Sequence, residues 1–167
     1  MKEKIMENKK NWFVMVFVFG FMTVGNIEAQ TDNRLNGTWV DETGNETAYN
    51  NGNFQVFVPN INSYGGRGTY TTNNGNITQI TTHVYGEGLS YILEELILAD
   101  VISPSSFSFS KKWYTKDEIQ TELTRHGYSE LLDLFLMFFS ELTVSYNVAG
   151  NLLIISIDGV RATARRK

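Results

Sequence analysis

The sequence contains no cysteine and only two histidines, His83 and His126. Without cysteine, a disulfide scaffold, thiol catalysis and a thioether-linked lipid are all excluded. A metal centre or a Ser-His hydrolase would have to use one of the two histidines. His83 follows a predicted strand and His126 ends a predicted helix, so we expect both to be structural polar residues. We therefore expect no metal ion and no cofactor.

The chain also lacks the short motifs that carry catalysis. There is no His-Glu-x-x-His, no Gly-x-Ser-x-Gly and no glycine loop with a lysine for phosphate. The acidic pairs Glu94-Glu95 and Asp117-Glu118 consist of adjacent residues, which do not face each other on a helix. They are better explained as solvated helix faces than as an acid and a base. The sequence predicts a protein that is not an enzyme.

The N-terminus has the pattern of a secretion signal. A lysine-rich start is followed by an apolar run over residues 12–24 and by Ile27-Glu28-Ala29, a cleavage site for a signal peptidase. The run is short for a helix that crosses a bilayer, which takes roughly 20 residues. We expect residues 1–29 to be cleaved, the protein to be periplasmic or secreted, and residues 30–167 to form one domain without a transmembrane segment.

The charge balance argues against nucleic acid as a partner. The formal net charge of the whole chain is −4. The predicted signal removes four lysines and three acids, so the remainder is more acidic still. Nucleic-acid binding requires clustered Lys and Arg, and here the basic cluster is the terminal Arg165-Arg166-Lys167. We expect no nucleic-acid partner, and the sequence identifies no protein partner.

The segment from Gly37 to about residue 82 reads as short strands separated by Asn and Gly. Residues 54–58 mix apolar and β-branched side chains, as in a half-buried strand. Residues 68–72 and 77–82 flank Asn73-Asn74-Gly75-Asn76, which predicts a hairpin with Gly where φ is positive.

The middle of the chain changes to helical periodicity. Residues 89–100 carry apolar side chains at helical spacing. Thr115 and Glu118 form a capping-box pattern that begins a helix, and Gly127 is a typical residue to end it. A second helix is expected from Ser129 or Glu130 to about Glu141, apolar nearly all the way round. Such a helix is buried on more than one side or covers something apolar.

The tail returns to strands. Residues 142–148 alternate strictly between apolar and polar, residues 152–157 follow a glycine turn, and Asp158-Gly159 predicts a further hairpin. About eight strands joined by tight turns avoid exposed edges by closing on themselves. The fold class is therefore mainly β: a single antiparallel up-and-down β-barrel of about eight strands, with a helical insertion at about 87–141.

Several of these segments resemble the bacterial lipocalin-like domain, a secreted calycin-type barrel. The matching segments are Gly37-Thr38-Trp39 for a G-x-W motif on the first strand, Gly68-Thr69-Tyr70 for a central strand, residues 146–155 for the Y-x-(I/V)-x-G-N-x-L-x-(I/L) hairpin, and Thr163-Ala164-Arg165 for a closing T-x-R. The resemblance covers the two ends of the chain and not the helical insertion. It implies that Arg165 stacks on Trp39 at the closed end of the barrel, with Arg161 as the alternative.

The resemblance also implies that a small hydrophobic molecule binds in the barrel or at its mouth. Alternation along the strands places six side chains on the ligand-facing side: Phe54, Val56, Tyr70, Ile80, Tyr146 and Ile155. An eight-stranded barrel is also narrow enough to be filled by its own side chains. The insertion would then be either a lid over a pocket or a plug. The alternative function is a cell-envelope interaction or structural protein with a filled barrel and no small ligand.

Overall fold

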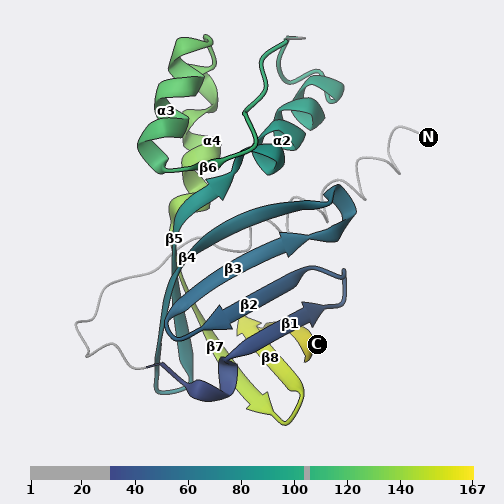
Figure 1. Ribbon diagram of the computed structural model, residues 1–167, viewed down its shortest axis with the longest axis vertical. Coiled ribbons are helices and arrows are strands. Elements are labelled where there is room, and N and C mark those ends of the chain that lie inside the picture. The colour runs from purple at the N-terminus through teal and green to yellow at the C-terminus, as the bar shows by residue number, and fades with distance from the viewer. Residues whose placement is uncertain (1–30, 104–105) are drawn as a thin grey trace.

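The computed structural model describes residues 31–103 and 106–167, so the predicted signal peptide at 1–29 lies outside the described residues. The described chain forms a sheet of nine strands and an inserted group of helices (Figure 1). The strands are β1 (Gly37–Asp41), β2 (Glu46–Asn50), β3 (Asn53–Val58), β4 (Ser63–Asn73), β5 (Asn76–Tyr85), β6 (Trp113–Tyr114), β7 (Glu141–Ala149), β8 (Leu152–Ile157) and β9 (Val160–Arg166).

Eight of these strands close into an antiparallel barrel, which confirms the predicted fold class. Around the barrel each strand pairs with the next barrel strand in the sequence, β5 pairs with β7 across the insertion, and β1 pairs with β9 to close the ring. The short β6 adds to the end of β5 outside this ring. Closure leaves the barrel strands without a free edge, as the series of tight turns predicted. The closed barrel is consistent with the calycin-type fold that the resemblance implies.

Three hairpins turn through two residues that both have positive φ: Asn51-Gly52, Asn74-Gly75 and Asp158-Gly159. Positive φ at both positions is the type I′ geometry, whose twist matches that of the strands. At Gly68 a different constraint applies, because a Cβ atom there would lie 1.9 Å from the Ile80 carbonyl oxygen. β4 and β5 approach this closely beside a register shift at Arg67/Gly68, so only glycine fits.

The helical insertion joins β5 to β7. It contains α2 (Gly86–Leu98), α3 (Lys116–Arg125), η3 (Ser129–Leu131), α4 (Leu132–Leu136) and η4 (Met137–Phe139). The predicted capping box of α3 is present, since Thr115 Oγ1 accepts from the Glu118 amide and the Glu118 carboxylate accepts from the Thr115 amide. No helix among the residues 31–103 and 106–167 is long and apolar enough to cross a bilayer.

The predicted second helix is divided, and it ends earlier than expected. The run from Ser129 alternates between 3₁₀ and α geometry instead of forming one regular helix. It ends at Phe139 because Ser140 is extended and Glu141 already pairs with Ile80 of β5. The ladder bond at the start of β7 therefore sets the end of the helical run.

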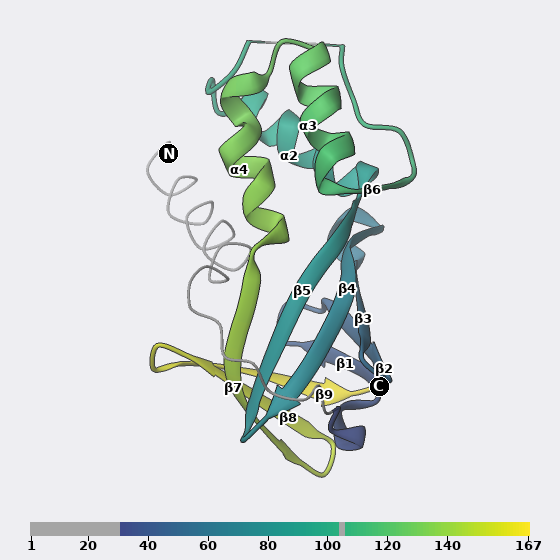
Figure 2. The same cartoon turned by 90° about the vertical axis from the view of Figure 1, so that its left-hand side faces the viewer.

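The barrel and the insertion have separate hydrophobic cores. The barrel core contains Leu35, Trp39, Tyr49, Phe54, Tyr70, Ile77, Leu142, Val144 and Leu153. The insertion core contains Val84, Leu89, Leu93, Leu96, Phe109, Tyr114, Ile119, Leu123, Leu131 and Phe135. Within the described part of the chain the two cores share no residue, so the buried side chains of the insertion pack with one another and not with the barrel core. The insertion stands beyond the ends of β4 and β5, at the opposite end of the molecule from η1 (Asn33–Leu35) (Figure 2).

Candidate functional site

Trp39 closes one end of the barrel. Its side chain is 1% exposed, and its Nε1 donates a hydrogen bond to the Leu35 carbonyl oxygen at 2.7 Å. The guanidinium of Arg166 lies 4.6 Å from the centre of the indole ring. The prediction that Arg165 stacks on Trp39 is wrong by one residue, because Arg166 makes this contact. Trp39 pairs with Arg166 across β1 and β9, and neighbouring side chains on a strand point to opposite faces, so Arg165 faces away.

Arg161, the alternative partner, is further from the indole. It pairs with Ser156 at the other end of β9, several residues before the position opposite Trp39. A strand rises about 3.3 Å per residue, so the side chain of Arg161 does not stack on the ring.

A polar cluster holds the N-terminal segment against the same end. The Arg34 guanidinium donates to both oxygens of the Asp32 carboxylate, and Oδ2 also accepts from the Tyr146 hydroxyl at 2.8 Å. The hydrogen bonds from Arg34 lower the pKa of Asp32 to about 2, although its burial acts in the opposite direction. Arg166 also donates to the Arg34 carbonyl oxygen at 2.6 Å. These contacts fix the closed end by means of charged hydrogen bonds.

Five of the six predicted lining residues belong to the barrel interior. Phe54 and Tyr70 are buried in its core, while Val56, Tyr146 and Ile155 are half-buried and pack against it. The prediction that Ile80 lines the interior is wrong, because 43% of its surface is exposed. On β5 the inward positions are those of Ile77, which is buried, and Gln79, which reaches an interior tyrosine. Ile80 is one residue after Gln79, so its side chain lies on the other face of the strand and points outward.

The interior side chains contact one another. The rings of Tyr49 and Tyr70 meet edge to face with centroids 4.9 Å apart. Gln79 Nε2 donates to the Tyr49 hydroxyl at 2.6 Å, and the Tyr70 hydroxyl donates to Asn36 Oδ1 at 3.2 Å. Burial raises the pKa of the Tyr49 phenol, so it stays protonated. These phenols are placed to fill and orient the interior.

A cluster of four rings lies on the outer face of the sheet, where the barrel meets the insertion. Phe57 and Tyr64 are opposite each other on β3 and β4, and Tyr85 and Trp113 are opposite each other on β5 and β6. Phe57 follows Val56, which packs against the barrel core, and Tyr85 follows Val84, which is buried in the insertion core, so the two rings point away from these cores. We call these four residues the outer aromatic cluster.

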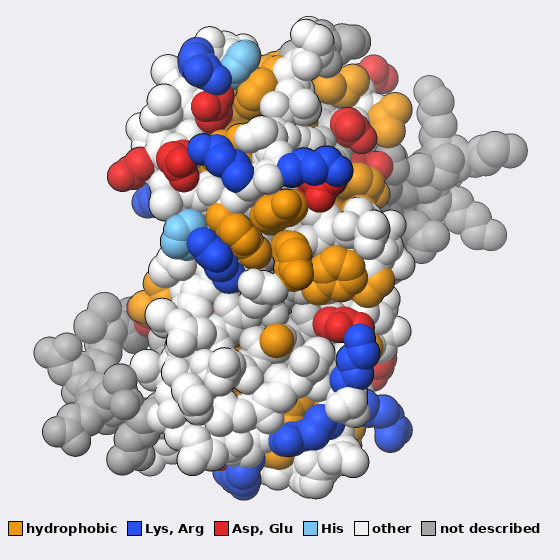
Figure 3. All heavy atoms as spheres, in the orientation of Figure 1, with side chains coloured by type: hydrophobic (Ala, Val, Ile, Leu, Met, Phe, Trp, Pro, Cys, Tyr) orange, Lys and Arg blue, Asp and Glu red, His pale blue; other side chains and the backbone are white. Residues whose placement is uncertain are grey.

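The rings of the outer aromatic cluster are in mutual contact. Tyr64 lies 5.5, 5.7 and 5.6 Å from Phe57, Tyr85 and Trp113, measured between ring centroids. Arg67 places its guanidinium 4.5 Å from the centre of the Trp113 ring. Tyr64 is 39% exposed and the other members are half-buried. Hydrophobic side chains form a band across the middle of this face, between insertion and barrel (Figure 3).

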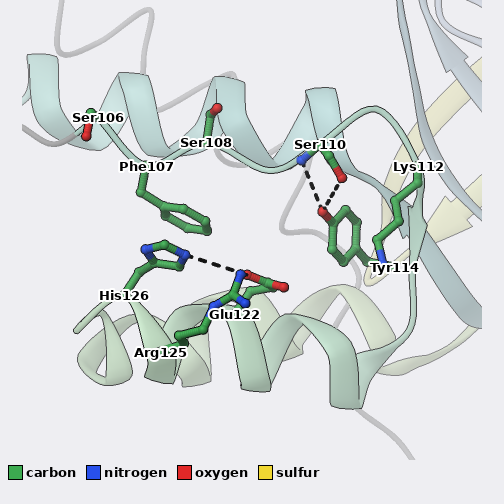
Figure 4. Close-up of a pocket in the computed structure, with 9 residues that line it drawn as sticks. All are labelled: Ser106, Phe107, Ser108, Ser110, Lys112, Tyr114, Glu122, Arg125 and His126. Atoms are coloured by element: carbon green, nitrogen blue, oxygen red, sulfur yellow. Dashed lines mark hydrogen bonds and ion pairs between the residues drawn. The ribbon is translucent and has the colours of Figure 1, made fainter.

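A polar groove lies within the insertion, between the segment 106–112 and α3 (Figure 4). Its volume is about 550 Å³. The lining residues are Ser106, Phe107, Ser108, Ser110, Lys112, Tyr114, Glu122, Arg125 and His126. Arg125 forms an ion pair with Glu122, and His126 Nε2 lies 3.7 Å from the same carboxylate. The His126 ring stacks on Phe107 with centroids 4.0 Å apart.

The two histidines lie far apart in the fold, on β5 and after α3. His83 Nδ1 lies 2.9 Å from Thr82 Oγ1, and His126 contacts Phe107 and Glu122. Within residues 31–103 and 106–167, no group of three or more His, Asp or Glu side chains is arranged to hold a metal ion.

Sequence reasoning missed both the outer aromatic cluster and the polar groove. The members of the cluster come from four strands, so no short motif joins them. A usable signal was present nonetheless: Phe57, Tyr64 and Tyr85 are large aromatic residues at positions where alternation predicts solvent-facing polar side chains. In the groove, Ser106, Ser108 and Ser110 alternate with Phe107 and Phe109, which indicates an extended segment with one hydroxyl-bearing face.

No family model matches this chain, and no curated protein matches it. Among solved structures it is similar to the crystal structure of an uncharacterized protein from Bacteroides eggerthii DSM 20697. The two share 13% sequence identity with a TM-score of 0.42, over 80% of this chain and 99% of that chain.

Proposed function

We propose that this chain is an exported, non-catalytic interaction protein of the lipocalin-like type. In this proposal the barrel is a filled scaffold, and the outer aromatic cluster binds a protein partner in the periplasm or outside the cell. The observation that carries the proposal is the set of four contacting rings, with Arg67 stacked on Trp113, on a face of the sheet that points away from both cores.

The composition of the cluster supports a protein partner. Contiguous apolar surface on a folded domain marks an interaction site more often than scattered apolar residues do. Trp, Tyr and Arg are the residues that contribute most to protein–protein binding, because they bury a large area and still offer a hydrogen-bonding group. Tyr64 is central and exposed, and its neighbours hold its ring in place. A partner would therefore meet a rigid surface and lose little side-chain entropy on binding.

The proposal is tested by cross-linking the tagged protein in cells that produce it. We expect a specific cross-linked product with the wild-type protein, and its loss when Tyr64→Ser removes the central ring. Val160→Ser is the matched control, because Val160 is an exposed apolar residue at the β8–β9 turn, outside the cluster. A product that survives Tyr64→Ser, or that is lost equally with Val160→Ser, would contradict the proposal.

A second candidate is the binding of a small hydrophobic molecule at the barrel mouth. One observation favours it: apolar interior side chains toward the helical end, Val56, Ile155 and Ile157, are half-buried, whereas Leu35 and Trp39 at the other end are fully buried. The mouth therefore offers apolar side chains that water reaches. An eight-stranded barrel is wide enough for one small ligand in such a position.

The two candidates make opposite predictions for one titration. If the mouth is the site, an apolar fluorophore gives a saturable signal that fatty acids displace. That signal is lost in Ile155→Trp, which fills the mouth, and is unchanged in Tyr64→Ser. If the outer aromatic cluster is the functional site, the fluorophore gives no saturable signal that depends on Ile155.

A further inference from the structure

We infer that the polar groove between residues 106–112 and α3 is a binding site for a neutral carbohydrate. The groove belongs to the insertion and does not include the outer aromatic cluster, so this inference is independent of the proposed function. Its volume of about 550 Å³ lies within the range of small-molecule sites, roughly 300–1,000 Å³. One wall is the extended segment with its serines, and the other is the C-terminal part of α3 (Figure 4).

The charges of the groove favour an uncharged ligand. Arg125 pairs with Glu122, and Lys112 pairs with Glu118 at 3.0 Å while lying over the Tyr114 ring. Each of these cations thus already has a carboxylate partner. An anion would have to compete with Glu122 and Glu118 for them, and a cation would have to displace Arg125 or Lys112. A neutral ligand can bind without displacing either the carboxylates or the cations from these ion pairs.

The hydrogen-bonding groups favour a ligand with several hydroxyls. Serine hydroxyls both donate and accept, the guanidinium of Arg125 carries five N–H donors, and the Glu122 carboxylate has acceptor positions beyond those its partners use. A carboxylate next to a guanidinium therefore offers acceptors and donors side by side. Two neighbouring hydroxyls of a sugar ring can bind both groups, donating to the Glu122 carboxylate and accepting from the Arg125 guanidinium. The stacked rings of Phe107 and His126 at one end offer an edge to the apolar C–H groups of a sugar.

Glu122 is the residue on which the site depends most. Its side chain is held by contacts from Arg125 and His126, three and four residues later on the same helix turn. This fixes the carboxylate at the wall of the groove before any ligand arrives, which lowers the entropic cost of binding. On the opposite wall the Ser110 hydroxyl lies 2.7 Å from the Tyr114 hydroxyl, whereas the Ser108 hydroxyl points away from Glu122 (Figure 4).

The test is isothermal titration calorimetry of the purified protein with a panel of probes. The neutral probes are glucose, galactose, mannose, N-acetylglucosamine and their linear trimers, and the charged probes are inorganic phosphate and spermidine. We expect at least one neutral saccharide to bind in a saturable manner. Glu122→Ala should weaken it at least about tenfold, as when one charged hydrogen-bond partner is lost. Ser108→Ala should weaken it less.

Two controls separate binding from folding. Glu130→Ala removes an exposed acid from the same insertion, away from the groove, and should leave the affinity unchanged. Helical circular dichroism of each variant checks that α3 is intact. The inference is overturned if no saccharide saturates, if phosphate or spermidine binds in place of saccharide, or if saccharide binding is the same in Glu122→Ala as in the wild type. Tyr64→Ser should not alter saccharide affinity, so the two proposals fail separately.

Discussion

The barrel and the helical insertion are stabilised in different ways. The barrel core contains Trp39, Tyr49 and Tyr70, whose polar atoms all have hydrogen-bond partners at fixed positions. The insertion core consists mostly of leucine and phenylalanine, with Tyr114 as the residue that carries a buried polar group. A core whose polar atoms must be matched specifies one arrangement, whereas an aliphatic core tolerates repacking.

The two regions also differ in the range of their contacts. The barrel is closed by pairing β1 with β9, which lie at opposite ends of the described chain. The insertion is built from helices that neighbour each other in sequence, begun by a local capping box. Because the cores share no residue among those described, we expect the two regions to respond separately to mutation. The outer aromatic cluster lies where the regions meet, on strands that serve both.

The largest effect is expected from Trp39→Ala in the barrel. Removing a fully buried indole leaves a cavity and deprives the Leu35 carbonyl oxygen of its donor, which should cost about 3–5 kcal/mol. Denaturant unfolding, followed by the loss of β-sheet circular dichroism, measures it. Trp113→Ala is the control, because that ring is half-buried on the outer face. A cost below about 1 kcal/mol for Trp39→Ala would mean that the indole does not close the barrel.

Phe135→Ala makes the matching change in the insertion. The ring is fully buried, so the loss should be about 3 kcal/mol, confined to the helices. We expect helical circular dichroism to disappear in an earlier transition, while the unfolding midpoint of the barrel changes little. Met137→Ala, at a nearby exposed residue, should have little effect on either. If Phe135→Ala shifted both transitions equally, the two regions would be a single cooperative unit.

Acid should weaken the closed end through Asp32. Its folded pKa of about 2 lies below the ordinary value of 3.8, so its contribution is fully present above about pH 4. As pH falls from about 4 to 2 the carboxylate is protonated, and about 1–2 kcal/mol of stability should be lost. Asp32→Asn should remove this part of the pH dependence while lowering stability at neutral pH. An unchanged pH profile in Asp32→Asn would contradict the assignment.

The smallest expected effect is a difference in stability between substitutions of two neighbouring arginines, Arg165 and Arg166. Arg166→Ala removes the guanidinium that stacks on Trp39 and the bond to the Arg34 carbonyl oxygen, which should cost about 1 kcal/mol. Arg165→Ala should cost less than about 0.5 kcal/mol, because the side chain faces the other way and is exposed. If the two substitutions lowered the free energy of unfolding equally, or if Arg165→Ala lowered it more, Arg165 would be the residue that stacks on Trp39, as the resemblance predicted.

Local rules predicted most of the elements. The Asn-Gly and Asp-Gly turns, the alternation of residues 142–148 and the capping box at Thr115 each depend on a few neighbouring residues, and all are present. The wrong predictions concern which face of a strand a side chain occupies (Ile80) and which residues of paired strands lie opposite each other (Arg165). Residues 77–80 place isoleucine on both faces of β5, so alternation alone did not decide which one points inward. The choice between Arg165 and Arg166 depends on the pairing of β1 with β9, which no local pattern determines.

The candidate sites were less predictable than the fold. Five interior positions followed from alternation, but whether they line a pocket or fill a core depends on how side chains from all strands pack together. The outer aromatic cluster forms because β3, β4, β5 and β6 lie side by side, and the polar groove because a loop lies against α3. Both depend on contacts between segments far apart in the sequence.

Native-state hydrogen exchange in increasing denaturant tests the division into two separately packed regions most directly. We predict that amides of α2, α3 and α4 exchange through an opening of lower free energy, during which the strands β1–β5 and β7–β9 stay protected. If helices and strands instead exchange with one common free energy and one denaturant dependence, the molecule has a single core and the account is wrong.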